Sequence, residues 1–176
     1  ENVVVVDSIS KAGFPPPGGA RVGILVSRNR ELMAQALKIC QGRLCAATLD
    51  QLGAAALYGV GSDYFSAVRE EYHRRRDTCM EGLSQIPGVV CECPKGAFYL
   101  MAKLPVDDTD KFQTWLLEEF QDNGETVMFA PGEGFYGTPG KGRDEVRLAY
   151  ILKQADLRRA MEVLAHGIEA YNSRKL

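Results

Sequence analysis

The sequence contains few of the residues that build metal centres. Among its 176 residues are two histidines, and its five cysteines lie at positions 40, 45, 79, 91 and 93. No two cysteines have the CxxC spacing of a zinc site, and an odd number does not suit a disulfide framework. We therefore predict no metal site. Reduced thiols are typical of cytosolic proteins, so a cytoplasmic location is expected.

The sequence also lacks a strong charge of either sign and a long apolar run. Its formal net charge of −2 at pH 7 provides no general attraction for nucleic acid or an anionic membrane. The basic run His73–Arg76 has acidic residues on both sides, which favours a solvated helix face over phosphate contacts. No stretch of about 18 apolar residues is present, and residues 1–10 lack the basic region of a signal peptide. Neither nucleic acid nor a membrane is predicted as a partner.

Residues 1–60 have the character of a piece cut from a larger α/β domain. Val3–Val6 predicts a buried strand, and because nothing precedes it, we expect that upstream sequence is missing. Thr48 or Asp50 is expected to cap a helix. The predicted elements are strands at 2–10 and 21–27 and helices at 31–42 and 48–57, with no sheet of their own.

Residues 63–86 predict one long amphipathic helix that ends at Pro87 and Gly88. After it the order is ββαββα, which indicates a mixed or antiparallel sheet covered by helices on one side, an α+β layer. Alternation places Cys91 and Cys93 on one strand face, in the core. The predicted strands are 89–93, 97–104, 126–130 and 145–152, and the predicted helices are 108–122 and 154–171.

A glycine-rich loop, 131–144, begins with the sequence PGEGFYG. It is not a GxGxxG turn between a strand and a helix, so a dinucleotide fingerprint is a poor fit. A flexible lid or a packing corner suits it better.

Lys11 is the first residue whose position suits chemistry. It follows an apolar strand and has Ser8 and Ser10 beside it. A strand end is rigid and a loop start is accessible, so a nucleophilic lysine could be held there. Most lysines at such positions are solvated surface residues, and the pattern alone does not decide between the two.

Arg147 is the second such residue, in the strand sequence EVRLAY at 145–150. If Val146 and Leu148 pack in the core, Arg147 lies on the opposite face. A rigidly mounted guanidinium can hold a carboxylate in a bidentate fork. A solvated arginine on an open strand face is the alternative, and spacing alone favours it.

Four motifs, in this order, give the chain a resemblance to a known family over essentially all of its length. Together they resemble the C-terminal half of class I/II aminotransferases, the fold-type I pyridoxal-phosphate enzymes, with the small-domain part most similar to bacterial aspartate-aminotransferase-like members. The motifs are SISK at 8–11, GARVG at 19–23, PKGAFY at 94–99 and EVRLAY at 145–150.

The resemblance implies a role for four residues. Lys11 would bind pyridoxal 5'-phosphate covalently and move a proton at the substrate's α-carbon. Ser8 and Arg21 would bind the cofactor phosphate, and Arg147 would bind the substrate α-carboxylate. Arg21 lies ten positions after Lys11, where the family usually has eight, so the intervening loop either carries a two-residue insertion or is altered. The implied activity is transfer of an amino group between an amino acid, with aspartate as a candidate, and a 2-oxo acid.

The resemblance also implies an organisation. Residues 1–62 would be the C-terminal part of the large cofactor-binding domain, 63–86 a connecting helix, and 87–176 the small domain. The family's N-terminal half would be absent, so the isolated chain is expected to lack a complete site. The parent protein is expected to be a homodimer with Leu44–Leu57 near its interface. Two alternatives stay open: a non-catalytic fragment or binding module that keeps the fold, and another pyridoxal-phosphate reaction such as β-elimination.

Overall fold

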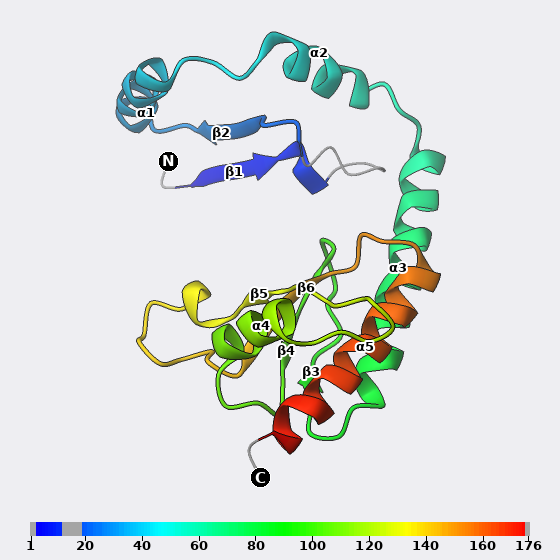
Figure 1. Ribbon diagram of the computed structural model, residues 1–176. Helices are drawn as coiled ribbons and strands as arrows, with labels where there is room; N and C mark the ends of the chain where they lie inside the picture. The colour runs from blue at the N-terminus through cyan, green and yellow to red at the C-terminus, as the bar shows by residue number, and fades with distance from the viewer. Residues whose placement is uncertain (1–2, 12–18, 175–176) are drawn as a thin grey trace. The chain divides into compact units, whose positions relative to one another are not determined.

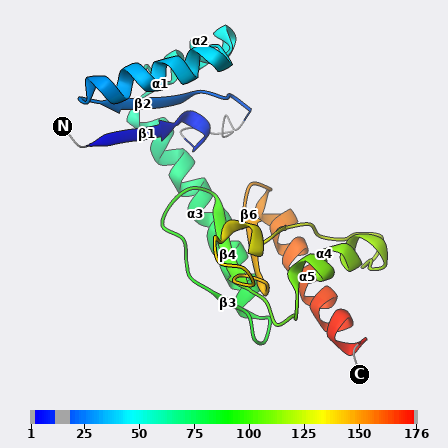
Figure 2. The same cartoon turned by 90° about the vertical axis from the view of Figure 1, so that its left-hand side faces the viewer.

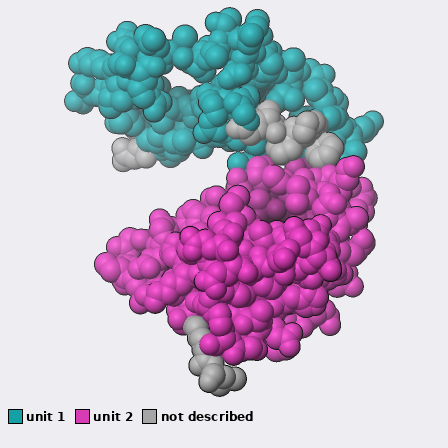
Figure 3. Space-filling view, viewed as in Figure 1, with its two compact units in different colours: residues 1–69 teal, residues 70–176 magenta. Residues whose placement is uncertain are grey.

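The structure, a computed structural model, describes residues 3–11 and 19–174 (Figure 1). The chain divides into two compact units, residues 1–69 and 70–176 (Figure 3). The division falls within helix α3 (Ser62–Ser84), which lies close to the predicted connecting helix. The finer division into 1–62, 63–86 and 87–176 stays a prediction. Within the described ranges, no helix has the length and apolar character needed to cross a membrane.

Unit 1 contains a two-stranded antiparallel ribbon, which is a correction to the prediction of strands without a sheet. The strands β1 (Val4–Ser8) and β2 (Gly23–Ser27) run side by side (Figures 1 and 2), with Ser8 opposite Gly23. Every residue of β1 is exposed, so the prediction of a buried strand is wrong for this unit. A two-stranded ribbon has little surface with which to cover its own side chains. The unit also contains η1 (Ile9–Lys11), α1 (Arg30–Arg43) and α2 (Thr48–Leu57).

The two helices of unit 1 begin differently. Asn29 caps α1, because its side chain accepts a hydrogen bond from the backbone N–H of Leu32 at 3.0 Å. Helix α2 begins after Ala47 with no side-chain cap, so the prediction that Thr48 or Asp50 caps it is wrong. Asp50 lies inside the first turn, where its negative charge suits the helix dipole.

Unit 2 is built on a four-stranded sheet of order β3-β4-β6-β5, in which every pair is antiparallel. The predicted ββαββα order and antiparallel α+β layer are therefore confirmed. One sheet face holds the buried side chains Leu100, Ala102 and Val146, and the other holds Met101 and Arg147. The elements of this unit are β3 (Val90–Cys91), β4 (Tyr99–Lys103), α4 (Thr109–Glu118), β5 (Ala130–Pro131), η2 (Glu133–Phe135), β6 (Glu145–Ala149) and α5 (Gln154–Ser173).

The core of unit 2 is aromatic, and its helices approach closely. The ring centroids of Phe112 and Tyr171 lie 5.0 Å apart, and those of Trp115 and Tyr171 lie 5.4 Å apart, a separation typical of favourable aromatic pairs. A Cβ built on Gly82 in α3 would lie 2.7 Å from Cγ of Met161 in α5. The absence of a side chain at Gly82 therefore lets α3 and α5 pack together.

Two sequence predictions about polar residues in unit 2 are wrong. Cys93 is exposed and Cys91 is half-buried, because β3 is only two residues long. The buried thiol is Cys79, where burial raises the pKa to about 11. Arg75, predicted on a solvated face, is buried and donates hydrogen bonds of 2.6 Å to Glu71 Oε1 and to the carbonyl oxygen of Ile151. A buried guanidinium persists only with such partners.

Candidate active site

Three polar side chains meet where β1 ends and β2 is about to begin. The hydroxyl of Ser8 donates to Ser10 Oγ at 3.1 Å, and Arg21 Nη1 donates to the same oxygen at 3.4 Å. The backbone N–H of Ile9 donates to the carbonyl of Val22 at 3.4 Å, so the strand pairing itself closes the two ends of the loop. The structure thus brings Ser8 and Arg21 together through Ser10.

The donors of this cluster match a phosphate group. Two hydroxyls and a guanidinium form strong charge-assisted hydrogen bonds to phosphate oxygens. Ser10 is buried, while Ser8 and Arg21 are exposed, so the cluster has one anchored member and two that an anion can reach. Lys11 is the last residue of η1 and is exposed directly after the cluster. Residues 12–18, most of the loop in which an insertion or an alteration is expected, lie outside the described residues.

Arg147 occupies the face of β6 opposite the buried side chain of Val146. Its Cζ lies 4.6 Å from the ring centroid of Tyr99 and 4.7 Å from that of Phe135. Tyr99 comes from β4, where Met101 is directly opposite Arg147, so Tyr99 is its diagonal cross-strand neighbour. Phe135 comes from η2 in the glycine-rich loop.

Arg147 is half-buried, and aromatic rings rather than acidic groups surround its guanidinium. Within the part of the chain that the structure describes, no carboxylate or carbonyl accepts a hydrogen bond from it. Guanidinium groups stack on aromatic faces and keep their N–H edge for a planar anion. This surrounding favours a carboxylate-binding arginine over a solvated one.

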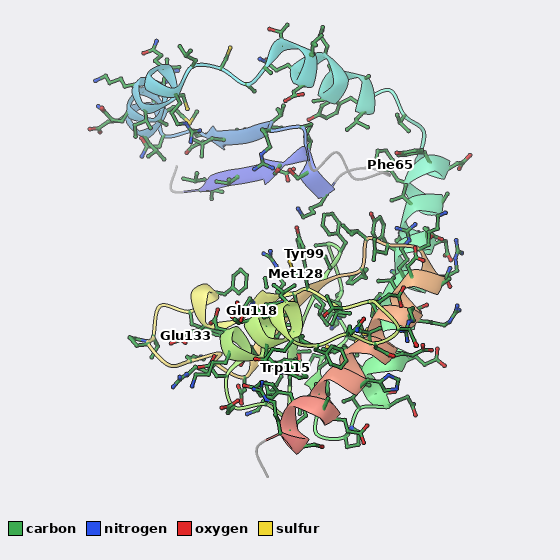
Figure 4. The ribbon with its side chains drawn as sticks, in the orientation of Figure 1. Phe65, Tyr99, Trp115, Glu118, Met128 and Glu133 are labelled. Carbon is green, nitrogen blue, oxygen red and sulfur yellow. The ribbon has the colours of Figure 1, made fainter. Side chains whose placement is uncertain are left out.

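An open cavity of about 500 Å³ adjoins Arg147 and Tyr99. Met128, which is 75% exposed, also lines it, and Figure 4 labels both Tyr99 and Met128. Its remaining walls are mainly apolar side chains from β6, the segment after it and α5. The cavity borders the arginine without supplying it with a charge partner.

The loop 131–144 is tied to β6 and α4 by hydrogen bonds, as expected of a packing corner. The N–H of Gly132 donates to the carbonyl of Glu145 at 2.7 Å, and that of Gly140 donates to Glu133 Oε1 at 2.9 Å. Arg143 donates to Asp108 Oδ2 at 2.8 Å, which ties the loop to the start of α4.

Comparison with known proteins identifies the family. The family model "Aminotransferase class I and II" matches residues 1–164, and the chain belongs to this family. It is 29% identical over 179 residues to an aspartate aminotransferase of Bacillus subtilis (strain 168), covering 98% of this chain and 42% of that protein. The chain therefore spans less than half the length of this relative.

Solved structures agree with this assignment. An aspartate aminotransferase from Rhizobium meliloti is 26% identical, with a TM-score of 0.72, covering 94% of this chain and 42% of that one. An alpha-aminoadipate aminotransferase from Thermus thermophilus, solved with N-(5'-phosphopyridoxyl)-L-leucine, is 23% identical with a TM-score of 0.80. It covers 97% of this chain and 43% of that one, and at this identity the likeness shows the fold alone.

The sequence assigned no role to three residues that the structure places at these sites. Ser10 joins Ser8 to Arg21, and the SISK motif that contains it was a usable signal. Tyr99 and Phe135 lie against Arg147. Nothing in the local sequence links Phe135 to Arg147, because they meet only through the tertiary path of the loop.

The ion pair between Asp108 and Arg143 of the corner can be tested through the pH dependence of stability. Its Oδ1 accepts hydrogen bonds from the backbone N–H groups of Asp110 and Lys111. These bonds, that of Lys111 first, and the hydrogen bond from Arg143 lower the pKa of Asp108. Because the pKa of Asp108 is lower in the folded state than in the unfolded state, the ionised carboxylate stabilises the fold at pH values above the unfolded-state pKa, near 3.9. This stabilisation is lost as the pH falls through the folded-state pKa.

We predict that Asp108→Asn, which keeps a capping oxygen, lowers the melting temperature at neutral pH. The difference from the wild type should vanish below the folded-state pKa of Asp108. Glu118→Gln, at the other end of the same helix, is the control and should give a small change of opposite sign because it removes a charge that opposes the dipole. A pH-independent difference for Asp108→Asn, measured by thermal denaturation, would contradict the electrostatic account.

Proposed function

We propose that the full-length parent of this chain is a pyridoxal-phosphate-dependent aminotransferase. It transfers an amino group between an amino acid, with aspartate as the first candidate, and a 2-oxo acid. The observation that carries the proposal is Arg147, a guanidinium held over two rings on a strand with no acidic partner among the described residues. Family membership and the named aspartate aminotransferases among the relatives support it.

In the proposed reaction the residues of this chain bind and orient the cofactor and the substrate. Ser8 and Arg21, which Ser10 joins, would hold the cofactor phosphate, and Lys11 at the end of η1 would bind the cofactor covalently. The bound cofactor supplies the electron sink. The Lys11 amine moves a proton at the substrate's α-carbon, and Arg147 fixes the α-carboxylate so that this carbon lies within its reach.

The two alternatives are separable by experiment. A non-catalytic module keeping the fold would form no product with any amino acid donor. A different reaction such as β-elimination would expel the substituent on the β-carbon and, after addition of water, release a 2-oxo acid and ammonia without an acceptor. Dependence of product formation on a 2-oxo acid acceptor therefore decides for amino-group transfer.

We further propose that the parent is a homodimer in the cytoplasm. Leu49 and Leu52 on α2 are 81% and 63% exposed, which fits an apolar surface that a second copy covers. All five cysteines are free thiols, as expected of a reducing compartment. Recovery of the parent in a membrane or periplasmic fraction would contradict the location.

The assignment of Lys11 predicts a labelling result. Borohydride reduction of the full-length parent with pyridoxal phosphate should fix the cofactor on Lys11, and peptide mass analysis should locate it there. Lys11→Arg should abolish the label while leaving the fold intact. Label on Lys95 or Lys103 in place of Lys11 would remove the assignment.

Arg147→Lys should lower kcat/KM of the parent. The lysine keeps the charge but loses the two-point fork. Loss of such a contact costs roughly 2–5 kcal/mol, and about 3 kcal/mol is on the order of a hundredfold in kcat/KM. The melting temperature should barely change.

Arg174→Lys is the matched control for this prediction. Arg174 lies over the rings of Trp115 and Tyr171, with centroids 4.9 and 4.8 Å from its Cζ, so the same chemical change removes a similar stacking. Its kcat/KM should equal that of the wild type. Equal values for Arg147→Lys and Arg174→Lys would take Arg147 out of the site.

The proposed homodimer leads to a third prediction. The parent should sediment as a dimer at micromolar concentration, and the pair Leu49→Glu and Leu52→Glu should shift it toward the monomer because it buries charge at the interface. Leu117→Glu, at a leucine on α4 that is 53% exposed, should leave the dimer intact. A wild-type monomer at that concentration would end the proposal.

A further inference from the structure

The glycine-rich corner 131–144 has a function that packing alone does not explain. A Cβ built on Gly132 would lie 2.6 Å from the carbonyl oxygen of Glu145 and 2.7 Å from that of Gly142. Real Cβ atoms do not approach backbone oxygens so closely, so only glycine lets the corner close onto β6 at this point. The close approach of the corner to β6 places Phe135, in η2, against Arg147 on the sheet.

The corner is tied at several points around Phe135. The hydroxyl of Tyr136 donates to the carboxylate of Glu145 at the start of β6. Glu133, at the beginning of η2, accepts from the N–H of Gly140. The N–H of Phe135 itself donates to the carbonyl of Gly132 at 3.0 Å. The backbone on both sides of Phe135 is therefore fixed relative to β6.

Phe135 nevertheless leaves half of its own surface uncovered. It is 50% exposed, so the corner is not closed in order to bury this ring. Its contact is with Arg147, whose guanidinium lies over both Phe135 and Tyr99. An arrangement that holds an exposed aromatic ring against a half-buried cation orients that cation.

Two rings restrict how an anion can approach Arg147. Aromatic faces that stack on a guanidinium occupy the directions above its plane and leave the N–H edge. A carboxylate is planar and binds that edge with two oxygens in the guanidinium plane. A sulfonate or phosphonate has a third oxygen that must project out of this plane, toward a ring.

We infer that Tyr99 and Phe135 are positioning residues that make the Arg147 site selective for planar carboxylates over tetrahedral oxyanions. The glycine-rich corner exists to place the second ring. The inference deepens the proposed function, because the carboxylate concerned is that of the proposed substrate. It requires neither the cofactor nor turnover to be tested.

The test uses the full 176-residue chain and two monoanions, acetate and methanesulfonate. The NMR signals of the Arg147 side chain report binding of each, and the ratio of the two dissociation constants is the selectivity. The wild type should prefer acetate. Phe135→Leu and Tyr99→Leu should each reduce that ratio by roughly threefold to tenfold, because removing a ring makes room for the third oxygen; this change corresponds to about 0.7–1.4 kcal/mol. Comparing ratios between variants removes the difference in basicity between the two anions.

Conservative variants and a second signal separate positioning from general structure. Tyr99→Phe and Phe135→Tyr keep a ring and should keep the ratio. Separate signals for the two terminal nitrogens of Arg147, which show restricted rotation, should merge in the leucine variants only. Phe65→Leu, at an aromatic residue that is 38% exposed in unit 1, is the control and should change neither signal.

Each outcome has one meaning. An unchanged ratio in both leucine variants, or no saturable response of Arg147 to acetate, overturns the inference. A parent without aminotransferase activity whose chain still shows ring-dependent selectivity overturns the proposed function alone. An active parent with an unchanged ratio overturns the positioning role alone.

Discussion

The antiparallel pairing of β4 with β6 is the constraint on which the rest of unit 2 depends. Its register places Tyr99 opposite Ala149 and Met101 opposite Arg147. Because side chains alternate across a strand, burying Val146 on one face commits Arg147 to the other. A slip of one residue would move Arg147 into the core, where an unpaired guanidinium is too costly. The hydrophobic face therefore determines the position of the cation.

Strand pairing also determines where the candidate site residues of unit 1 lie. Pairing of β1 with β2 sets Ser8 opposite Gly23, and the ladder brings the two ends of the intervening loop together. Ser8, Ser10 and Arg21 then share hydrogen bonds at one strand end. In both units a backbone ladder supplies the rigidity, and the side chains of the candidate site lie at its edge or on its open face. Each candidate anion site thus follows from a strand register.

Buried polar contacts hold the scaffold around these sites. Arg75 reaches from α3 to the carbonyl of Ile151, two residues after β6 ends. Asp108 joins the first turn of α4 to Arg143 in the corner. Such contacts are favourable because each buried or partly buried charge has a partner. They connect α3 to the segment that follows β6, and α4 to the corner that carries Phe135.

The sequence alone determined the element order, the antiparallel α+β layer of unit 2 and the residues Lys11, Ser8, Arg21 and Arg147 as candidates, because periodicity and short motifs are local properties. It failed for Cys93, for Arg75 and for the start of α2, where neighbours distant in the chain decide burial and capping. Only the tertiary structure decided that Phe135 contacts Arg147. That contact depends on the close approach of Gly132 to the backbone of Glu145. A periodic sequence pattern reports local structure, so it does not predict that the loop packs back against β6.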